Sequence, residues 1–344
     1  MKKMTPVQRR NITMPTIEQA VSNYVTAMTL EGKSPAYTDW LRRRLGDFAK
    51  FFQASQGQAR IDSLTIEDGR AFVKYLMERK QRYIGHKLRN EIEGGLAPTT
   101  IHGYVRALRS FSSWLSNEGH TDENIFVGIK PPKLPQTLIN PLSEDEIRKL
   151  LLAVQRDTLE GTRNYAILLM FLDAGVRLSE LINLKLGDVD FGVGQFKVFG
   201  KGAKERLVPL GQTAKKALIR YVERARPDPV NPTEQRVFLT VSGLPISKDS
   251  VAKVIQRLAK RTGISRLHPH LFRHTFAVRY LINGGDVFTL QKILGHSSLD
   301  MTRKYVTLAS TDVKQKHILF SPIDHLGLAE FRRGRPKRQT VQPA

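Results

Sequence analysis

The stretch HPHLFRHTFAVRYLINGG, residues 268–285, has the pattern of one complete amphipathic helix. Apolar residues recur at three- and four-residue spacing, and the paired Gly284 and Gly285 supply a stop. On the first turn, His270 and Arg273 stand three positions apart and project from the same side. The imidazole and guanidinium groups could together form a site for an oxyanion. Alternatively, His270 caps the helix and Arg273 is an ordinary surface charge. The expected core face consists of Leu271, Phe272, Phe276, Leu281 and Ile282.

The composition of the whole chain points to a polyanionic partner. Among 344 residues, 55 Lys and Arg stand against 32 Asp and Glu, a formal charge of +23. Such self-repulsion does not help folding, so nucleic acid is the leading partner and an anionic membrane surface the second. No apolar run approaches the roughly 20 residues that span a bilayer, and the N-terminus lacks a signal peptide. A cytoplasmic setting in a bacterium or archaeon is expected.

Metal and thiol chemistry find little support in the sequence. The chain has no cysteine, which excludes disulfides, thiolate catalysis and Cys-ligated zinc. His268 and His274 flank His270, but the HExxH arrangement and an acidic ligand in register are missing. We therefore expect no metal site and no cofactor, and treat His268 and His274 as incidental.

Two domains joined by a linker are expected, followed by a tail. Residues 16–130 have helical periodicity in four segments and form a predicted helical DNA-binding bundle, with the polar stretch 83–96 as a loop. The stretch KPPKLPQTLINP contains four prolines, so residues 131–141 are predicted to be an extended linker. A second domain, 142–325, opens with Ser143 as helix cap, and a basic tail covers 326–344. Arginines on the polar faces of the first domain are Arg42, Arg43, Arg44, Arg106 and Arg109.

The second domain is mainly helical but contains one clear β signal. In GQFKVFGKGAKERLVPLG, residues 194–211, two alternating runs flank a Gly-Lys-Gly turn, which predicts a hairpin. Just before it, Gly175 is expected to end one helix and Arg177 to begin the next. An arginine at that position adds to the positive end of the helix dipole, where a phosphate could bind.

Residues 287–305, VFTLQKILGHSSLDMTRKY, predict a short helix, a stop at Gly295, a polar turn with His296, and a helix carrying Tyr305. Considered alone, most tyrosines in such a place pack their ring and hydrogen-bond their hydroxyl group.

Together these motifs resemble the catalytic set of the tyrosine recombinases, in the Xer and phage-integrase branch. The resemblance is carried by AGVRLSEL, GKGAKERLVPL, HLFRHTFA, LGH and a tyrosine nine residues later, in family order. It covers nearly the whole chain, because the N-terminal helices resemble that family's core-binding domain. It implies a mainly α fold with a small β-hairpin (an α+β catalytic domain), in a two-domain, C-shaped clamp around DNA.

The resemblance also implies a role for each matching residue. Tyr305 would be the nucleophile, and Arg177 and Arg273 would hold the non-bridging oxygens of the scissile phosphate. Lys201 would protonate the leaving 5′-oxygen, with Lys204 as its rival for that role. His270 would act as acid–base partner and His296 as a further hydrogen-bond donor.

The chemistry of a phenol nucleophile explains why such a set is needed. A tyrosine with a pKa of about 10 is phenolate in roughly one molecule in a thousand at neutral pH, a cost of about 4 kcal/mol. A nearby base and two arginines offset this cost. Bidentate guanidinium groups also stabilise the charge on the phosphate oxygens, and the leaving alkoxide requires an acid.

The expected activity is site-specific DNA recombination through a 3′-phosphotyrosine and a Holliday junction. No phosphate-binding GxxxxGK[ST] loop or acidic two-metal cluster is present, consistent with a reaction that uses neither ATP nor metal. Two alternatives remain: a type IB topoisomerase, which only swivels and reseals DNA, and a DNA-binding protein whose catalysis has decayed. The residues that read the DNA target are defined only by a complex with DNA. The fold supports integration, excision, inversion and dimer resolution alike.

The C-terminal region suggests two further contacts. The family assembles as a tetramer on paired double-stranded DNA sites, and a C-terminal segment docks on the neighbouring subunit; folding back on its own domain is the alternative. The tail RRGRPKR resembles an AT-hook, in which Arg333 and Arg335 enter a minor groove, although a basic tail also tethers DNA without sequence preference. Apolar residues available for docking are Val313, Ile318, Leu319, Phe320 and Ile323.

Overall fold

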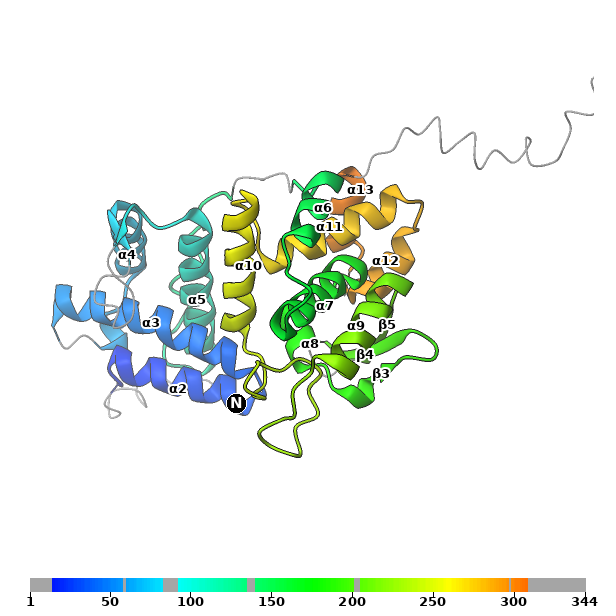
Figure 1. The fold of residues 1–344 in the computed structure, drawn as a ribbon. Helices are drawn as coiled ribbons and strands as arrows, with labels where there is room; N and C mark the ends of the chain where they lie inside the picture. The colour runs from blue at the N-terminus through cyan, green and yellow to red at the C-terminus, as the bar shows by residue number, and fades with distance from the viewer. Residues whose placement is uncertain are drawn as a thin grey trace, which may run out of the picture. The chain divides into compact units, whose positions relative to one another are not determined.

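The computed structural model describes residues 14–57, 60–82, 92–134, 140–200, 205–296 and 298–308. The chain divides into two compact units, 1–137 and 138–344, and the division falls inside the proline-rich stretch. Figure 1 shows that both are built mainly from helices. The described strands form two small antiparallel sheets, one in each unit. The predicted fold class is therefore confirmed. Within the described residues, no helix has the length and apolar character needed to cross a membrane.

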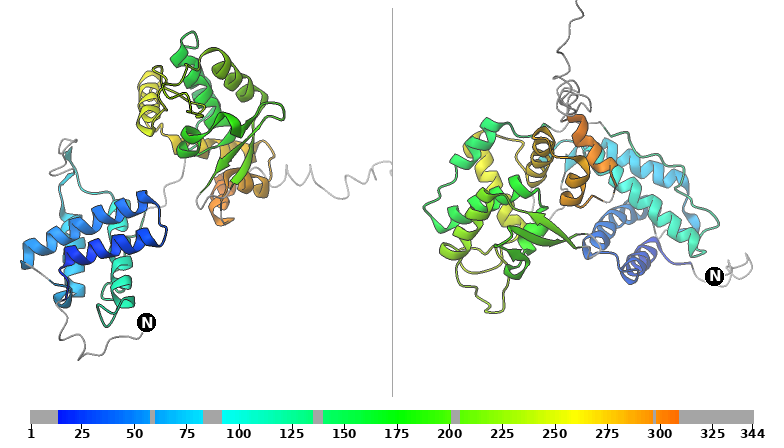
Figure 2. Two further views of the ribbon diagram at one scale, coloured as in Figure 1. Left: turned by 90° about the horizontal axis from the view of Figure 1, so that it is seen from below. Right: turned by 90° about the vertical axis from the view of Figure 1, so that its right-hand side faces the viewer.

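The N-terminal unit is a bundle of the four predicted helices. They are α2 (Ile17–Leu30), α3 (Pro35–Gln56), α4 (Ile66–Glu78) and α5 (Pro98–Asn117), with a short 3-10 turn, η1 (Ile61–Ser63). Helices α2 and α3 lie side by side (Figure 2), and their inner faces meet a core of aromatic rings. At the start of α5, Ala97 occupies the cap position and Pro98 the first turn. Proline suits that position, since its missing N–H would have no partner there.

One part of the N-terminal unit was wrongly predicted. The stretch 83–96 was expected to be a loop, but β2 (Ile92–Glu93) pairs antiparallel with β1 (Gln81–Arg82). Strands of two residues are too short to show an alternating pattern, so the sequence carries no signal for them.

The C-terminal unit contains eight described helices around one core. They are α6 (Glu144–Leu152), α7 (Leu159–Ala174), α8 (Leu178–Asn183), α9 (Gln212–Arg224), α10 (Lys248–Thr262), α11 (Pro269–Ile282), α12 (Val287–Leu294) and α13 (Asp300–Leu308). Helix α7 packs against α9 and α11, and α11 also packs against α13. The rings of Phe171 and Phe272 stack 5.7 Å apart at the α7–α11 contact. Ser143 caps α6 through a reciprocal capping box with Glu146, as predicted.

The small sheet has one strand more than the predicted hairpin. Strands β4 (Gln195–Phe199) and β5 (Glu205–Pro209) pair antiparallel, with Phe196 opposite Val208. After the 3-10 turn η2 (Leu186–Asp188), the two-residue β3 (Val189–Asp190) adds to the outer side of β4. Residues 201–204, which include Lys201 and Lys204, lie outside the described residues. The distances given for the active site therefore include neither Lys201 nor Lys204.

Helix α11 follows its predicted pattern except at its last residue. Leu271, Phe272, Phe276 and Leu281 are buried, whereas Ile282 is 48% exposed. Successive helical residues point about 100° apart, so once Leu281 takes the inward position its neighbour faces outward.

Candidate active site

Arg177 lies between the end of α7 and the start of α8. Gly175 ends α7 in the left-handed conformation, with φ of 59°, and Arg177 is the cap residue of α8. Its backbone N–H donates to Glu180 Oε2 at 2.9 Å, and its Nη1 donates to Glu180 Oε1 at 2.7 Å. The guanidinium group is held at the helix start, half-exposed, as the sequence predicted.

Glu180 is a buried carboxylate that organises two arginines. Besides Arg177, it accepts from Nη1 and Nη2 of Arg206 at 2.9 and 2.8 Å. Arg206 also donates through Nε to the carbonyl oxygen of Ile293 at 2.7 Å, which ties β5 to α12. Burial would raise the pKa of Glu180, but hydrogen bonds from Arg206 and Arg177 outweigh it and hold the pKa below its ordinary value. Sequence reasoning missed both residues.

Arg273 lies on α11 and is buried. Its Nη1 donates to the carbonyl oxygen of Gly175 at 2.8 Å, and its Nη2 donates to that of Leu294 at 2.7 Å. Arg273 thereby joins the ends of α7 and α12. Burial, reinforced by the positive charge of Arg177, lowers its pKa to about 10, so it stays charged at neutral pH.

His296 follows α12 and supports Arg273. Its Nε2 lies 3.1 Å from Nη2 of Arg273, and its Nδ1 lies 2.9 Å from Oγ1 of Thr302. An arginine can only donate, so Nε2 must be the accepting nitrogen of a neutral ring and Nδ1–H must donate to Thr302. Burial first, then the charge of Arg273, lowers the pKa of His296 to about 4, which agrees with a neutral ring.

Tyr305 on α13 is buried between two histidine rings. The His274 ring centroid is 5.5 Å away at an interplanar angle of 48°, and that of His296 is 6.2 Å away at 18°. The hydroxyl oxygen lies 2.7 Å from Nδ1 of His274. Burial raises the pKa of Tyr305, while the charges of Arg273 and Arg177 act in the opposite direction.

The histidine in contact with Tyr305 is His274, whereas the sequence singled out His270. The side chain of His270 is exposed on the first turn of α11. Partial desolvation lowers the pKa of His270, and the positive charges of His268 and Arg273 act in the same direction. His274, set aside as incidental, is the residue in contact with the Tyr305 hydroxyl group. The two histidines are four positions apart and so share a helix face, a signal that the sequence contains.

The charge of this cluster suits an anion. The guanidinium groups of Arg177 and Arg206 bond the carboxylate of Glu180, and that of Arg273 is within its electrostatic reach. One carboxylate among three guanidinium groups leaves an excess of positive charge beside Tyr305. Guanidinium groups bind phosphate oxygens in paired hydrogen bonds. Across the part of the chain that the structure describes, no group of three or more His, Asp or Glu side chains could hold a metal ion.

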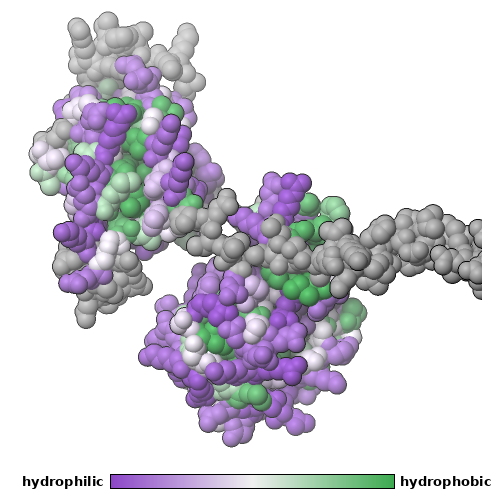
Figure 3. Space-filling model, turned by 90° about the horizontal axis from the view of Figure 1, so that it is seen from above, coloured by the Kyte–Doolittle hydropathy of each residue, from purple (hydrophilic) through white to green (hydrophobic). Residues whose placement is uncertain are grey.

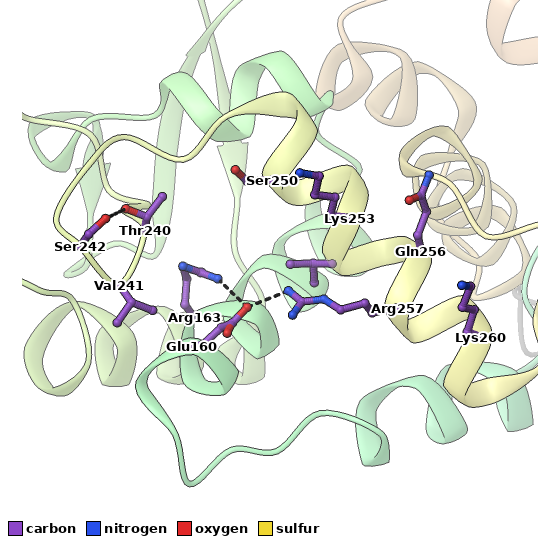
Figure 4. A pocket seen from close by; sticks show the side chains of 11 residues that line it. Glu160, Arg163, Thr240, Val241, Ser242, Ser250, Lys253, Gln256, Arg257 and Lys260 are labelled. Carbon is purple, nitrogen blue, oxygen red and sulfur yellow. Dashed lines mark hydrogen bonds and ion pairs between the residues drawn. The ribbon is translucent and has the colours of Figure 1, made fainter. Parts of the chain in front are cut away.

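A second basic feature of the C-terminal unit is a cavity of about 790 Å³ beside α10 (Figure 4). Lys253, Gln256, Arg257 and Lys260 reach it from one exposed face of the helix. Glu160 of α7 accepts from Arg257 at 2.8 Å, which holds that side chain in place. This face was not predicted from the sequence, although its basic residues recur there at a spacing of three and four.

The candidate DNA-binding arginines fall into two groups. Arg43 on α3 and Arg106 and Arg109 on α5 are exposed on the N-terminal unit. Arg43 donates through Nε to the backbone oxygen of Asp39 at 3.2 Å. The other two candidates, Arg333 and Arg335, lie outside the described residues.

Comparison with known proteins identifies the family. Residues 140–311 match the phage integrase family. The tyrosine recombinase XerC of Oceanobacillus iheyensis is 30% identical over 314 residues, which cover 90% of this chain and 98% of XerC. The tyrosine recombinase XerD of Listeria innocua is 34% identical over 245 residues, 68% of this chain and 82% of XerD. The chain belongs to the phage integrase family and is a site-specific tyrosine recombinase, a DNA strand transferase.

Solved structures share the fold. The Tn1549 transposon integrase, in complex with a circular intermediate DNA, aligns with a TM-score of 0.65 at 20% identity, covering 91% of this chain and all (100%) of that one. The XerH recombinase bound to its palindromic difH substrate aligns with a TM-score of 0.63 at 18% identity, covering 84% and 80%. The XerC and XerD relatives do not favour the alternatives of a topoisomerase and of a decayed DNA-binding protein.

Proposed function

We propose that Tyr305 attacks a DNA phosphodiester and forms a 3′-phosphotyrosine, with the neighbouring arginines binding the phosphate. The observation that carries this proposal is that the Tyr305 ring stacks against His296, which contacts Arg273, while the charges of Arg273 and Arg177 both act on the Tyr305 hydroxyl group. Fixed guanidinium groups stabilise the charge that spreads over the phosphate oxygens during attack.

The remaining site residues would complete the reaction. His296 keeps Arg273 oriented through its Nε2, so its role is support of that arginine in addition to any contact with DNA. His270, exposed at the start of α11, would be the acid–base partner beside the phosphate. Lys201 would protonate the leaving 5′-oxygen, with Lys204 as its rival. The 5′-hydroxyl group of a second strand would then attack the phosphotyrosine and restore the backbone through a Holliday junction, without ATP or metal.

DNA would be held by basic faces on both units. Lys253, Arg257 and Lys260 supply one such face on α10, in the arrangement that Figure 4 shows. Arg106 and Arg109 supply another on α5. Contacts of this kind neutralise phosphates and release counterions, so binding weakens as salt rises. Arg43, Arg333 and Arg335 would add to this binding.

We also propose a tetramer on two DNA sites, with exchange of the segment that follows α13. The docking residues Val313 and Ile318 to Phe320 lie outside the described residues. Support comes from exposed apolar side chains on α12 and α13: Phe288 is 62% exposed, Met301 45% and Val306 45%. Figure 3 shows that such apolar patches interrupt a mostly hydrophilic surface. Truncation after Ser310 should abolish cooperative binding to a two-site duplex; unchanged cooperativity would contradict the exchange.

The experiment that tests the function starts from a library of nicked duplexes. DNA that becomes covalently attached to the purified protein is sequenced, which identifies a site, and two such sites are then placed on one plasmid. A recombinase yields four-way junctions and recombinant products from that plasmid. Relaxation of supercoils at any sequence, with no junction, would contradict the proposal.

A further inference from the structure

Among the described residues, one side chain is hydrogen-bonded to the Tyr305 hydroxyl group. It is His274, whose Nδ1 lies 2.7 Å from the phenol oxygen. None of the hydrogen bonds of the described residues joins His270 to Tyr305, although the resemblance makes His270 the acid–base partner. In the His274 tautomer that carries its hydrogen on Nε2, the phenol donates this bond and its proton points to Nδ1. The resemblance assigns no role to His274.

We propose that His274 is a further catalytic residue, the base that removes the proton of Tyr305 during strand cleavage and returns it during resealing. This inference rests on the proposed function, since it requires Tyr305 to be the nucleophile. In cleavage, the O–H bond of Tyr305 breaks, Nδ1 of His274 gains the proton, and the phenolate oxygen bonds to phosphorus as the P–O bond to the 5′-oxygen breaks. The leaving 5′-oxygen takes a proton from the acid–base group on its own side. In resealing, the incoming 5′-hydroxyl loses its proton to the acid–base group on its own side, and the departing phenolate recovers the proton from His274.

The environment of His274 keeps its imidazole ring neutral, so that a ring nitrogen can accept a proton. Burial, followed by the charges of nearby groups, lowers the pKa of His274 to about 4, so the ring is neutral at neutral pH. A neutral imidazole with its hydrogen on Nε2 presents a lone pair at Nδ1, the nitrogen that faces the hydroxyl. The contact length is within hydrogen-bond reach for proton transfer.

Arrival of DNA would strengthen this base. The groups that act on His274 are the cap residue His268, His270 and Arg273 of α11, and Lys304 and Tyr305 of α13. His296, in the turn after α12, is also within electrostatic reach. The basic groups among them all disfavour a protonated His274, and none of the groups is a carboxylate. A phosphate bound to the arginines adds a negative charge beside them, which raises the pKa of His274. Activation of Tyr305 is thus coupled to occupation of the phosphate site.

The test separates loss of a base from loss of a contact. In His274→Asn, an amide oxygen can accept the hydroxyl hydrogen bond but cannot take the proton, whereas His274→Phe keeps a ring and removes both. The rate of covalent attachment is measured in a single turnover on a suicide duplex from pH 6 to 10. The scissile 5′-oxygen of this duplex is replaced by sulfur, whose thiolate leaves without a general acid, so the assay reports on the nucleophile alone.

We expect His274→Asn to react at least about 10²-fold more slowly at pH 7. The deficit should shrink as pH rises, because hydroxide then removes the phenol proton. The matched control is His120→Asn, which changes a histidine of the N-terminal unit whose ring contacts Trp114 and should leave the rate unchanged. Melting temperatures and circular dichroism spectra of all variants establish that they are folded.

Two results would overturn the inference. One is a His274→Asn rate equal to wild type at every pH; the other is a deficit that is the same at every pH, which would make His274 a positioning residue only. Neither result touches the proposed function, which is tested separately by Tyr305→Phe on the same duplex. Attachment of that variant would contradict the nucleophile itself.

Discussion

Replacing Glu180 with glutamine should destabilise the C-terminal unit far more than a typical surface substitution. The side chain of Glu180 is 3% exposed and that of Arg206 12%, so water screens their interaction little. Removing one partner of a buried ion pair costs about 3–5 kcal/mol. Glutamine retains one hydrogen-bond acceptor, so we expect the lower end, about 3 kcal/mol. Arg177 is 32% exposed and adds little to this sum.

The measurement is thermal unfolding followed by calorimetry. For a unit of this size, about 3 kcal/mol corresponds to a Tm lower by about 6–12 °C. The control is Glu160→Gln: Glu160 also bonds two arginines, Arg257 and Arg163, but it is 40% exposed. Buried Arg163 keeps other acceptors, the backbone oxygen of Leu239 and Oδ1 of Asn164. We therefore expect Glu160→Gln to cost about 0–1 kcal/mol. Equal effects of the two substitutions would refute the reasoning.

The pH dependence of the Glu180 effect has a defined sign. Despite its burial, hydrogen bonds from Arg206 and Arg177 hold the folded-state pKa of Glu180 below the ordinary value of 4.5. The stabilisation is thus fully present above that value and is lost as the pH falls through the folded-state pKa. The gap in unfolding free energy between wild type and Glu180→Gln should shrink in acid. A gap that widened in acid would contradict this assignment.

Three further substitutions test other parts of the site. Gly175→Ala would place a Cβ 2.3 Å from the Phe276 ring at a φ of 59°, so we expect a loss of about 1–3 kcal/mol in thermal unfolding. Arg273→Lys cannot hold its carbonyl partners and a phosphate together, and should slow covalent attachment by about 10²-fold or more. Lys260→Gln should reduce the slope of log affinity against log salt by about 1 in a DNA-binding titration, whereas Lys149→Gln on α6 should not.

Much of the local structure was predictable because it depends on neighbours in the sequence. Helical periodicity identified the helices of the N-terminal unit and several of the C-terminal unit, though not α9 and α10, and cap chemistry identified Ser143. The end of a helix at Gly175 was predicted because glycine commonly ends helices. Gly175 has a left-handed φ of 59°, a conformation that glycine adopts easily. The candidate catalytic set was predicted from motifs in order along the chain. The structure brings four of its members, Arg177, Arg273, His296 and Tyr305, into one cluster.

The parts that could not be predicted depend on packing between distant segments. The contact between His274 and Tyr305 joins residues 31 positions apart, and it exists because α11 packs against α13. Likewise Glu180 and Arg206 are 26 positions apart, on a helix and a strand. A pattern in one segment cannot report a partner in another. The two-residue strands β1 to β3 were missed for a different reason, since so few residues form no alternation.

The central claim concerns one bond, the ester between the Tyr305 oxygen and a 3′-phosphate. It is tested most directly by incubating wild type and Tyr305→Phe with a nicked suicide duplex carrying the identified site, followed by denaturing electrophoresis. Wild type should migrate as a covalent protein–DNA adduct, and mass spectrometry of the adduct should locate the nucleotide on Tyr305. The Phe variant should bind the duplex without forming any adduct; an adduct from that variant would assign the attack to another atom.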